Sequence, residues 1–270
     1  MRRTLKRPSE RHSSAVAKSA CLLLAGLLLG CRLHAGRQVG SDAVVGKENG
    51  DDLVLVLPML SERQVEDGLL RVSAAASVPI GIETLWHDEG RRVIIQGTHM
   101  QRRVNVTGRS MAGALNLVML DPPGGARGGH PVFRLSWSDE GMAHVALPEA
   151  DRLLDIVIPT LRLSAVPLDQ ALAAIFKEIW PGAKVRREFT GRVLGAATED
   201  PRQDKTAPGE FSTPISVSLR GATARAALDA IAEQGHLSWV LRRSDSQGVP
   251  AGSQLLLASF ANRTVTFSIR

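Results

Sequence analysis

The feature that most constrains this chain is an internal repeat of a strand, a capped helix and a strand. In the clearer copy, Ile215–Trp239, apolar residues alternate up to Gly221, Thr223 is placed to cap a helix, and Gly235 ends that helix. The weaker copy, Val104–Val118, aligns with it without gaps at a constant offset of 113 residues. A chain with this pattern is expected to build the same supersecondary unit twice.

A second pair of segments aligns in the same order, at an offset of 102 residues. Asp67 then falls on Asp169, and Leu70 falls on Leu172. The second copy therefore carries 11 more residues between its two parts. This insertion fits the segment Gly191–Pro214, whose proline, glycine and charge content is typical of an exposed loop.

The order of short strands and helices predicts an α+β fold. We expect two tandem lobes, residues 51–150 and 151–270, in which helices pack on small mixed sheets, with the inserted loop 191–214 in the second lobe. The first helix of each lobe is expected at Ser61–Ser77 and Leu168–Trp180, where apolar residues keep helical spacing.

Residues 1–31 have the pattern of a signal sequence. Basic residues precede the apolar run Ala20–Gly30, whose eleven residues are too few to cross a bilayer as a helix. The sequence Leu28-Leu29-Gly30-Cys31 resembles the lipobox of bacterial lipoproteins, which predicts a lipid on Cys31; cleavage after Ala35 is the alternative. The polar, glycine-rich segment 32–50 is then expected to be a flexible tether. We therefore expect a periplasmic or cell-envelope protein, lipid-anchored to the outer membrane.

Export changes what the composition implies. Cys21 and Cys31 are the two cysteines of the chain, so the exported protein has no disulfide, and we expect neither a thiol enzyme nor a cysteine metal site. Residues 1–31 hold six of the 33 basic residues and one of the 27 acidic ones, which leaves 27 basic and 26 acidic residues. This near-neutral balance, without tyrosine, argues against nucleic-acid binding.

The sequence shows no pattern of catalytic or metal-binding residues. It contains no G-x-S-x-G element, its histidines have no ligand spacing, and its glycine pairs lack the strand and helix of a phosphate loop. The helical acids Asp67, Asp169 and Asp229 are expected to face solvent. The four tryptophans are expected to anchor the core, with a sugar-binding groove as the alternative. We therefore expect no cofactor and no enzymatic activity.

Two segments of the second copy carry a resemblance to a known family. They are Leu161–Ile175 and Val217–Trp239, each with an Ala-Leu pair in its helix, Ala171-Leu172 and Ala227-Leu228. They resemble the short N-terminal domain shared by outer-membrane secretins and signalling TonB-dependent receptors. The resemblance implies two βαβ units and binding to other proteins in the periplasm, without catalytic residues. The chain departs from the family in that no β-barrel or secretin segment follows Arg270, so we expect a stand-alone exported relative.

The leading hypothesis is a non-enzymatic module that docks onto another envelope protein. Docking is expected at a sheet edge or helix face of the second copy, at Val217, Leu219, Leu237 and Trp239, because small sheets leave unpaired strand edges. Two alternatives remain open. One is a sensor that binds a small ligand between the copies, and the other is a cell-wall-active hydrolase.

Overall fold

A computed structural model describes residues 41–46, 52–58, 62–86, 101–119, 133–146, 153–193, 211–244 and 253–270. These residues belong to one compact unit, Val39–Arg270. The predicted signal sequence 1–31 and the predicted lipidation of Cys31 lie outside the described residues. Within the described part of the chain, no helix has the length and apolar character needed to span a membrane.

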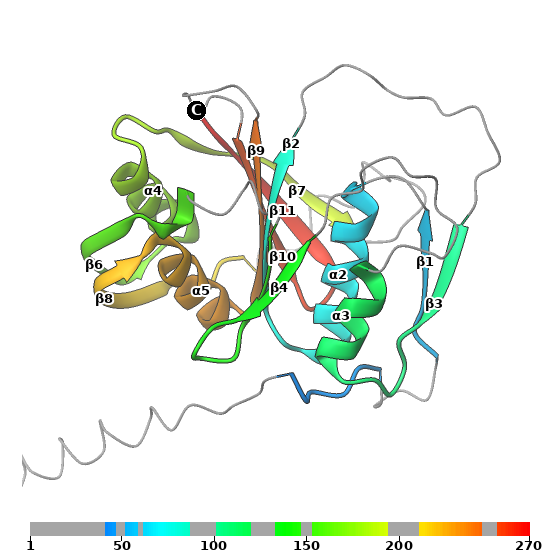
Figure 1. Ribbon diagram of the computed structural model, residues 1–270. Coiled ribbons are helices and arrows are strands. Elements are labelled where there is room, and N and C mark those ends of the chain that lie inside the picture. The colour runs from blue at the N-terminus through cyan, green and yellow to red at the C-terminus, as the bar shows by residue number, and fades with distance from the viewer. Residues whose placement is uncertain are drawn as a thin grey trace, which may run out of the picture. The chain divides into compact units, whose positions relative to one another are not determined.

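The fold is α+β, as the sequence predicts (Figure 1). We call residues 51–150 the first half and residues 151–270 the second half. The first half contains β1 (Val54–Pro58), α2 (Glu62–Ala76), β2 (Ile80–Trp86), β3 (Gln101–Asn105), α3 (Met111–Met119), β4 (Arg134–Trp137) and β5 (Ala143–Ala146). The second half contains η2 (Leu153–Asp155), β6 (Val157–Val166), α4 (Leu168–Ile179), β7 (Val185–Val193), β8 (Ile215–Thr223), α5 (Ala224–Gly235), β9 (Leu237–Ser244), β10 (Ser253–Ser259) and β11 (Arg263–Ile269).

Strands of both halves join one central sheet. Its order is β4-β5-β2-β9-β10-β11-β7, and two separate pairs, β1–β3 and β6–β8, lie outside it. The halves meet where β2 runs parallel to β9, with Gly81 beside Trp239 and Ile82 beside Val240. The expected tandem arrangement of two separate lobes is therefore not confirmed, because the halves share a sheet.

The two faces of the central sheet carry two different cores. In Figure 1, α2, α3 and the β1–β3 pair lie on one side of the sheet, and α4, α5 and the β6–β8 pair lie on the other. Along β9, Trp239 and Leu241 belong to the core of the second half, while Val240 belongs to the core of the first half. Strand β10 alternates in the same way, with Leu255 and Leu256 on opposite faces. Continuous apolar runs in these strands are explained by burial on both faces.

The repeated positions share their local structure. Gly108 and Gly221 both have positive φ, +69° and +62°, a conformation that favours glycine. Each helix is then capped by a hydroxyl: Ser110 Oγ accepts from the amide of Gly113, and Thr223 Oγ1 accepts from the amide of Ala226. Helices α3 and α5 begin at residues that the offset of 113 places opposite each other.

Part of the predicted tether is built into the fold, which corrects that prediction. Val45 is fully buried in the core of the first half. Its amide donates to the carbonyl of Arg109, and its own carbonyl accepts from the amide of Gly108. The apolar side chains of Ala43 and Val45 explain the difference, because packing them in the core of the first half removes apolar surface from water.

Of two predicted boundaries in the second half, one differs from the structure and one is confirmed. The inserted loop was expected to start at residue 191, but β7 continues to Val193, which pairs with Arg263. Residues 194–210 lie outside the described part, and Phe211, beyond them, is buried. Helix α5 ends at Gly235, as predicted, and the residue that takes the left-handed conformation after it is His236, with φ 52°.

Candidate functional site

The described residues form an open pocket of about 600 Å³ between the start of α5, in the second half, and the edge of the central sheet that the first half contributes. Strands β4, β5 and β2 make its floor, while the first turns of α5 and the end of η2 make its wall. Side chains of both charges line it: Glu83, Asp139, Asp155, Asp229, Arg134 and Arg225.

Strand alternation explains why the floor is polar. On β4, the side chains of Leu135 and Trp137 pack against the core of the first half, which turns Arg134 and Ser136 to the opposite face. On β5, Ala143 and Val145 belong to that same core, and His144 lies between them on the pocket side. The apolar residues of β4 and β5 therefore pack in the core of the first half, and their polar residues face the second half.

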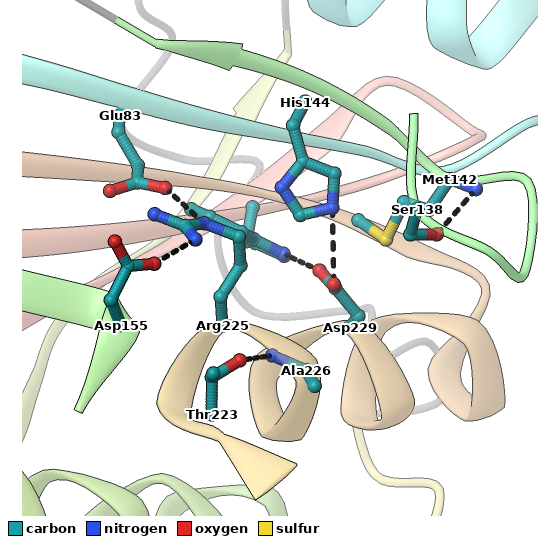
Figure 2. Close-up of polar contacts among 10 residues, drawn as sticks. Glu83, Ser138, Met142, His144, Asp155, Thr223, Arg225, Ala226 and Asp229 are labelled. Atoms are coloured by element: carbon teal, nitrogen blue, oxygen red, sulfur yellow. Dashed lines mark hydrogen bonds and ion pairs between the residues drawn. The ribbon is translucent and has the colours of Figure 1, made fainter. Parts of the chain in front are cut away.

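The wall of the pocket comes from the start of α5. Arg225 and Asp229 are four residues apart, so they share one face of the helix. The Thr223 cap fixes where the helix begins and thereby sets the direction of that face. Both side chains point toward strands of the first half (Figure 2).

Arg225 joins two carboxylates (Figure 2). Its Nε donates to Glu83 Oε1 at 2.7 Å, and its Nη1 donates to Asp155 Oδ1. Burial raises the pKa of Glu83, against the opposing effect of Arg225. Burial alone would lower the pKa of Arg225, but its contacts with Glu83 and Asp155 outweigh burial and raise that pKa.

A second buried group surrounds Asp229. Its Oδ1 accepts from the indole Nε1 of Trp239 at 3.0 Å, and its Oδ2 lies 3.1 Å from His144 Nε2. The His144 contact has the distance of an ion pair but not the alignment of a hydrogen bond. The rings of His144 and Trp239 meet edge to face, with centroids 5.9 Å apart.

Gly81 lets Trp239 lie flat against the neighbouring strand. A Cβ atom at Gly81 would stand 2.3 Å from Trp239 Cζ2, closer than any real contact. Trp239 is fully buried, so it has no room to move aside. The glycine therefore positions Trp239, and Trp239 in turn holds Asp229 through its indole N–H.

Among the described residues, the polar atoms that the pocket leaves without a partner include hydrogen-bond acceptors. Glu83 Oε2 and His144 Nδ1 are buried and have no hydrogen-bond partner in the described part of the chain. No cluster of three or more acidic, histidine or cysteine residues suited to a metal ion occurs among the described residues. The arrangement can therefore accept hydrogen bonds from a donor-rich ligand.

The four residues predicted to bind a partner lie in different environments. Val217 and Leu219 are on β8 with their side chains turned toward the core of the second half. Leu237 and Trp239 are buried on β9, between β2 and β10. This burial corrects the prediction for Leu237 and Trp239, because a central strand has no free edge and its side chains are out of a partner's reach.

Strand β8 does have a free edge among the described residues, since it pairs with β6 alone. The amide of Ala224 donates to the carbonyl of Ile156, so these two residues form a hydrogen-bonded pair. Hydrogen-bonded and non-hydrogen-bonded pairs alternate along an antiparallel ladder, which assigns every other pair of β6 and β8. The same register places Leu219 opposite Leu161 and Val217 opposite Leu163. These are the non-hydrogen-bonded pairs, so the backbone groups of Val217 and Leu219 point away from β6.

Sequence reasoning missed the residues of the pocket. Asp229 was expected to face solvent, yet it is 4% exposed. His144 was given no role and is buried beside it. Of the other helical acids, Asp169 is exposed and pairs with Arg187 at 2.5 Å. The spacing of Arg225 and Asp229 beside the apolar stripe of α5 was the one available signal.

The tryptophans follow the predicted core role where the structure describes their side chains. Trp239 is in the core, Trp180 stacks on Phe176 with centroids 5.8 Å apart, and Trp137 packs against the first-half core. For the alternative of a sugar-binding groove, Trp137 lines the pocket described above, whereas Trp180 and Trp239 do not. Comparisons of the chain with protein-family models, with characterised proteins and with solved structures find no match.

Proposed function

We propose that this protein is a non-enzymatic interaction module of the cell envelope that binds an extended segment of another envelope protein along the free edge of β8. The observation that carries the proposal is that edge, nine residues long and paired on one side only among the described residues. A partner strand can add to such an edge through backbone hydrogen bonds. The backbone N–H and C=O groups of Val217 and Leu219, which point away from β6, supply the hydrogen bonds to the partner.

Other strand edges carry features that discourage pairing. Strand β7 has the exposed charged residues Arg186, Arg187 and Glu188, and its register against β11 shifts twice. Charges and bulges of this kind protect edge strands from added partners. On β6, Pro159 stands at an outward position and has no amide hydrogen to donate.

Strand β8 has fewer of these features: its pairing with β6 shifts register once, near Ile215 at its start. Its outward side chains Ser216 and Ser218 are small and exposed, and its first charged residue is Arg220. The equivalent strand of the first half, β3, is shorter and carries the exposed Arg103. Of the four strands compared, β8 therefore has the edge best suited to accept a partner strand. The envelope location rests on the signal pattern of residues 1–31.

Photo-crosslinking in intact cells tests the proposal. A benzoylphenylalanine at Ser218 of β8 is compared with one at Asn105 of β3, the exposed position that the repeat places opposite Ser218. We expect an adduct with one envelope protein from Ser218 and none from Asn105. Equal adducts from both positions, no adduct from Ser218, or a cytoplasmic partner would contradict the proposal.

A proline variant asks whether the backbone edge itself binds. Val217→Pro removes an amide that points away from β6, so the β6–β8 ladder keeps its hydrogen bonds. We expect this variant to fold and to lose the Ser218 adduct. Val217→Ala shortens the same side chain but keeps the amide, so it should keep the adduct. If both variants retain it, strand addition at β8 is wrong.

A further inference from the structure

We propose that the pocket between α5 and strands β4, β5 and β2 binds a small organic cation, a molecule with an ammonium or guanidinium group. This site uses different residues from the β8 edge, and it stands whether or not that edge binds a partner. Its volume of about 600 Å³ lies within the roughly 300–1,000 Å³ of typical small-molecule sites. Three observations favour a cation: the negative charge of the pocket lining, the acceptor atoms there that lack a partner among the described residues, and the guanidinium of Arg225, which already lies among the carboxylates.

The lining carries more acid than base. Four carboxylates, those of Glu83, Asp139, Asp155 and Asp229, face two guanidinium groups, Arg134 and Arg225. Arg225 alone is shared by Glu83 and Asp155. The excess negative charge lies partly out of water, which concentrates cations and repels anions.

Two buried groups that line the pocket lack a hydrogen-bond donor. The side chains of Glu83 and His144 are 3% and 8% exposed, and neither Glu83 Oε2 nor His144 Nδ1 has a partner within the described residues. A carboxylate oxygen only accepts, and a neutral imidazole accepts at whichever ring nitrogen carries no proton. Both atoms are satisfied by a ligand that donates several hydrogen bonds, as an ammonium group does.

The edge of β4 adds further acceptors. The amide of Ser138 donates to the carbonyl of Met142, so the alternation of this ladder directs the backbone of Leu135 and Trp137 away from β5. Both residues line the pocket, although their side chains pack against the first-half core. Their outward carbonyls can accept from a bound cation.

The protein's own arginine shows that a cation fits among these carboxylates. Figure 2 shows the guanidinium of Arg225 between Glu83 and Asp155. It engages one oxygen of Glu83 and leaves the other free of a partner in the described structure. A ligand cation can therefore join the same carboxylate on its unused side after a small side-chain movement.

Three five-carbon molecules separate charge from size: cadaverine, a dication; glutarate, a dianion; and 1,5-pentanediol, which is neutral. Each is titrated into the protein by calorimetry and by NMR of the indole N–H of Trp239, which is bonded to the pocket residue Asp229. We expect cadaverine to bind saturably and to shift the Trp239 signal, and the other two to do neither. Binding of glutarate or pentanediol as tightly as cadaverine, or no binding of cadaverine, overturns the proposal.

Variants assign the binding to the pocket. Ser136→Trp places a large side chain over the floor and should abolish cadaverine binding. Asp139→Asn removes an exposed charge and should weaken binding about two- to fivefold. Asp169→Asn removes an exposed charge on α4, outside the pocket, and should change nothing. Because Asp139 and Asp169 are both exposed, both variants should fold; binding that resists Ser136→Trp and Asp139→Asn, or that is lost with Asp169→Asn, contradicts the site.

Discussion

Helices α3 and α5 hold equivalent places in the two halves, but their polar faces differ. Their apolar stripes agree: Ala114 and Leu115 are buried in one core as Ala227 and Leu228 are in the other. At the positions of Arg225 and Asp229, however, the offset of 113 places Ala112 and Asn116, and Asn116 is exposed. The repeat therefore fixes how each helix packs on the sheet and leaves its polar positions free to diverge.

The shared sheet explains why α5 acquired charged partners. Strands β2 and β5 belong to the first half, yet Glu83 and His144 on these strands face α5. The opposite face of the same junction has a buried pair of its own, because Glu66 of α2 binds Arg242 of β9. Each face of the sheet therefore has a buried ion pair that connects the two halves.

The largest effect is expected where the halves touch most closely. Gly81→Ala drives a methyl group into the buried ring of Trp239 and should lower the free energy of unfolding by about 3 kcal/mol. Gly113→Ala on α3 is the matched change, since its Cβ meets only Ser110 Oγ at 3.2 Å. It should change stability by less than about 1 kcal/mol. Urea unfolding of the three proteins measures both changes, and equal losses would mean that Gly81 has no special role.

The next effect separates the two helices directly. Asp229→Ala leaves the buried indole N–H of Trp239 without its acceptor and should cost about 2–3 kcal/mol. Asn116→Ala makes the matched change at an exposed position of α3 and should cost less than about 0.5 kcal/mol. Thermal unfolding with a van't Hoff analysis compares them. A similar small loss in both would show that the buried group around Asp229 is not formed.

The pH dependence of stability tests the burial of Glu83. Because burial raises its pKa above the ordinary 4.5, ionised Glu83 is disfavoured in the folded protein. Its favourable contribution, relative to Glu83→Gln, is fully present below pH 4.5 and is lost as pH rises through the raised pKa. The loss has a slope of at most about 1.4 kcal/mol per pH unit. Urea unfolding of both proteins from pH 4 upward measures it, and a difference that grows in favour of the wild type with rising pH would contradict the assignment.

The smallest effect tests where the two halves agree. Thr223→Ala and Ser110→Ala each remove a hydroxyl that caps a helix, and each should cost about 1 kcal/mol. Their equality would support the equivalence of α3 and α5 at their first turns. Chemical denaturation resolves a difference of this size, and a loss confined to one variant would show that only one of the caps forms in solution.

The sequence could predict what depends on local spacing. The caps at Ser110 and Thr223 and the positive-φ glycines Gly108 and Gly221 follow from a few neighbouring residues, and the repeat marked them twice. The α+β class follows from the alternation of such segments. These features need no knowledge of which strands pair.

The pocket could not be predicted because it depends on pairing between distant strands. Glu83 meets Arg225 across 142 residues, and this contact exists only because β2 pairs with β9. The same pairing buries Trp239 in the middle of a sheet, where a prediction based on two separate lobes would leave it near an edge. The apolar runs of β9 and β10, buried on both faces, were the sequence signal for a shared sheet.

The most direct test of the shared sheet is to express residues 151–270 alone and record their amide NMR spectrum. Without the first half, β9 loses its pairing with β2, and Val240 and Leu256 lose the core that covers them. The shared sheet predicts that this fragment lacks dispersed signals and unfolds without a cooperative transition. A well-dispersed spectrum, with a cooperative transition as stable as that of the intact chain, would contradict the claim that the two halves form one folding unit.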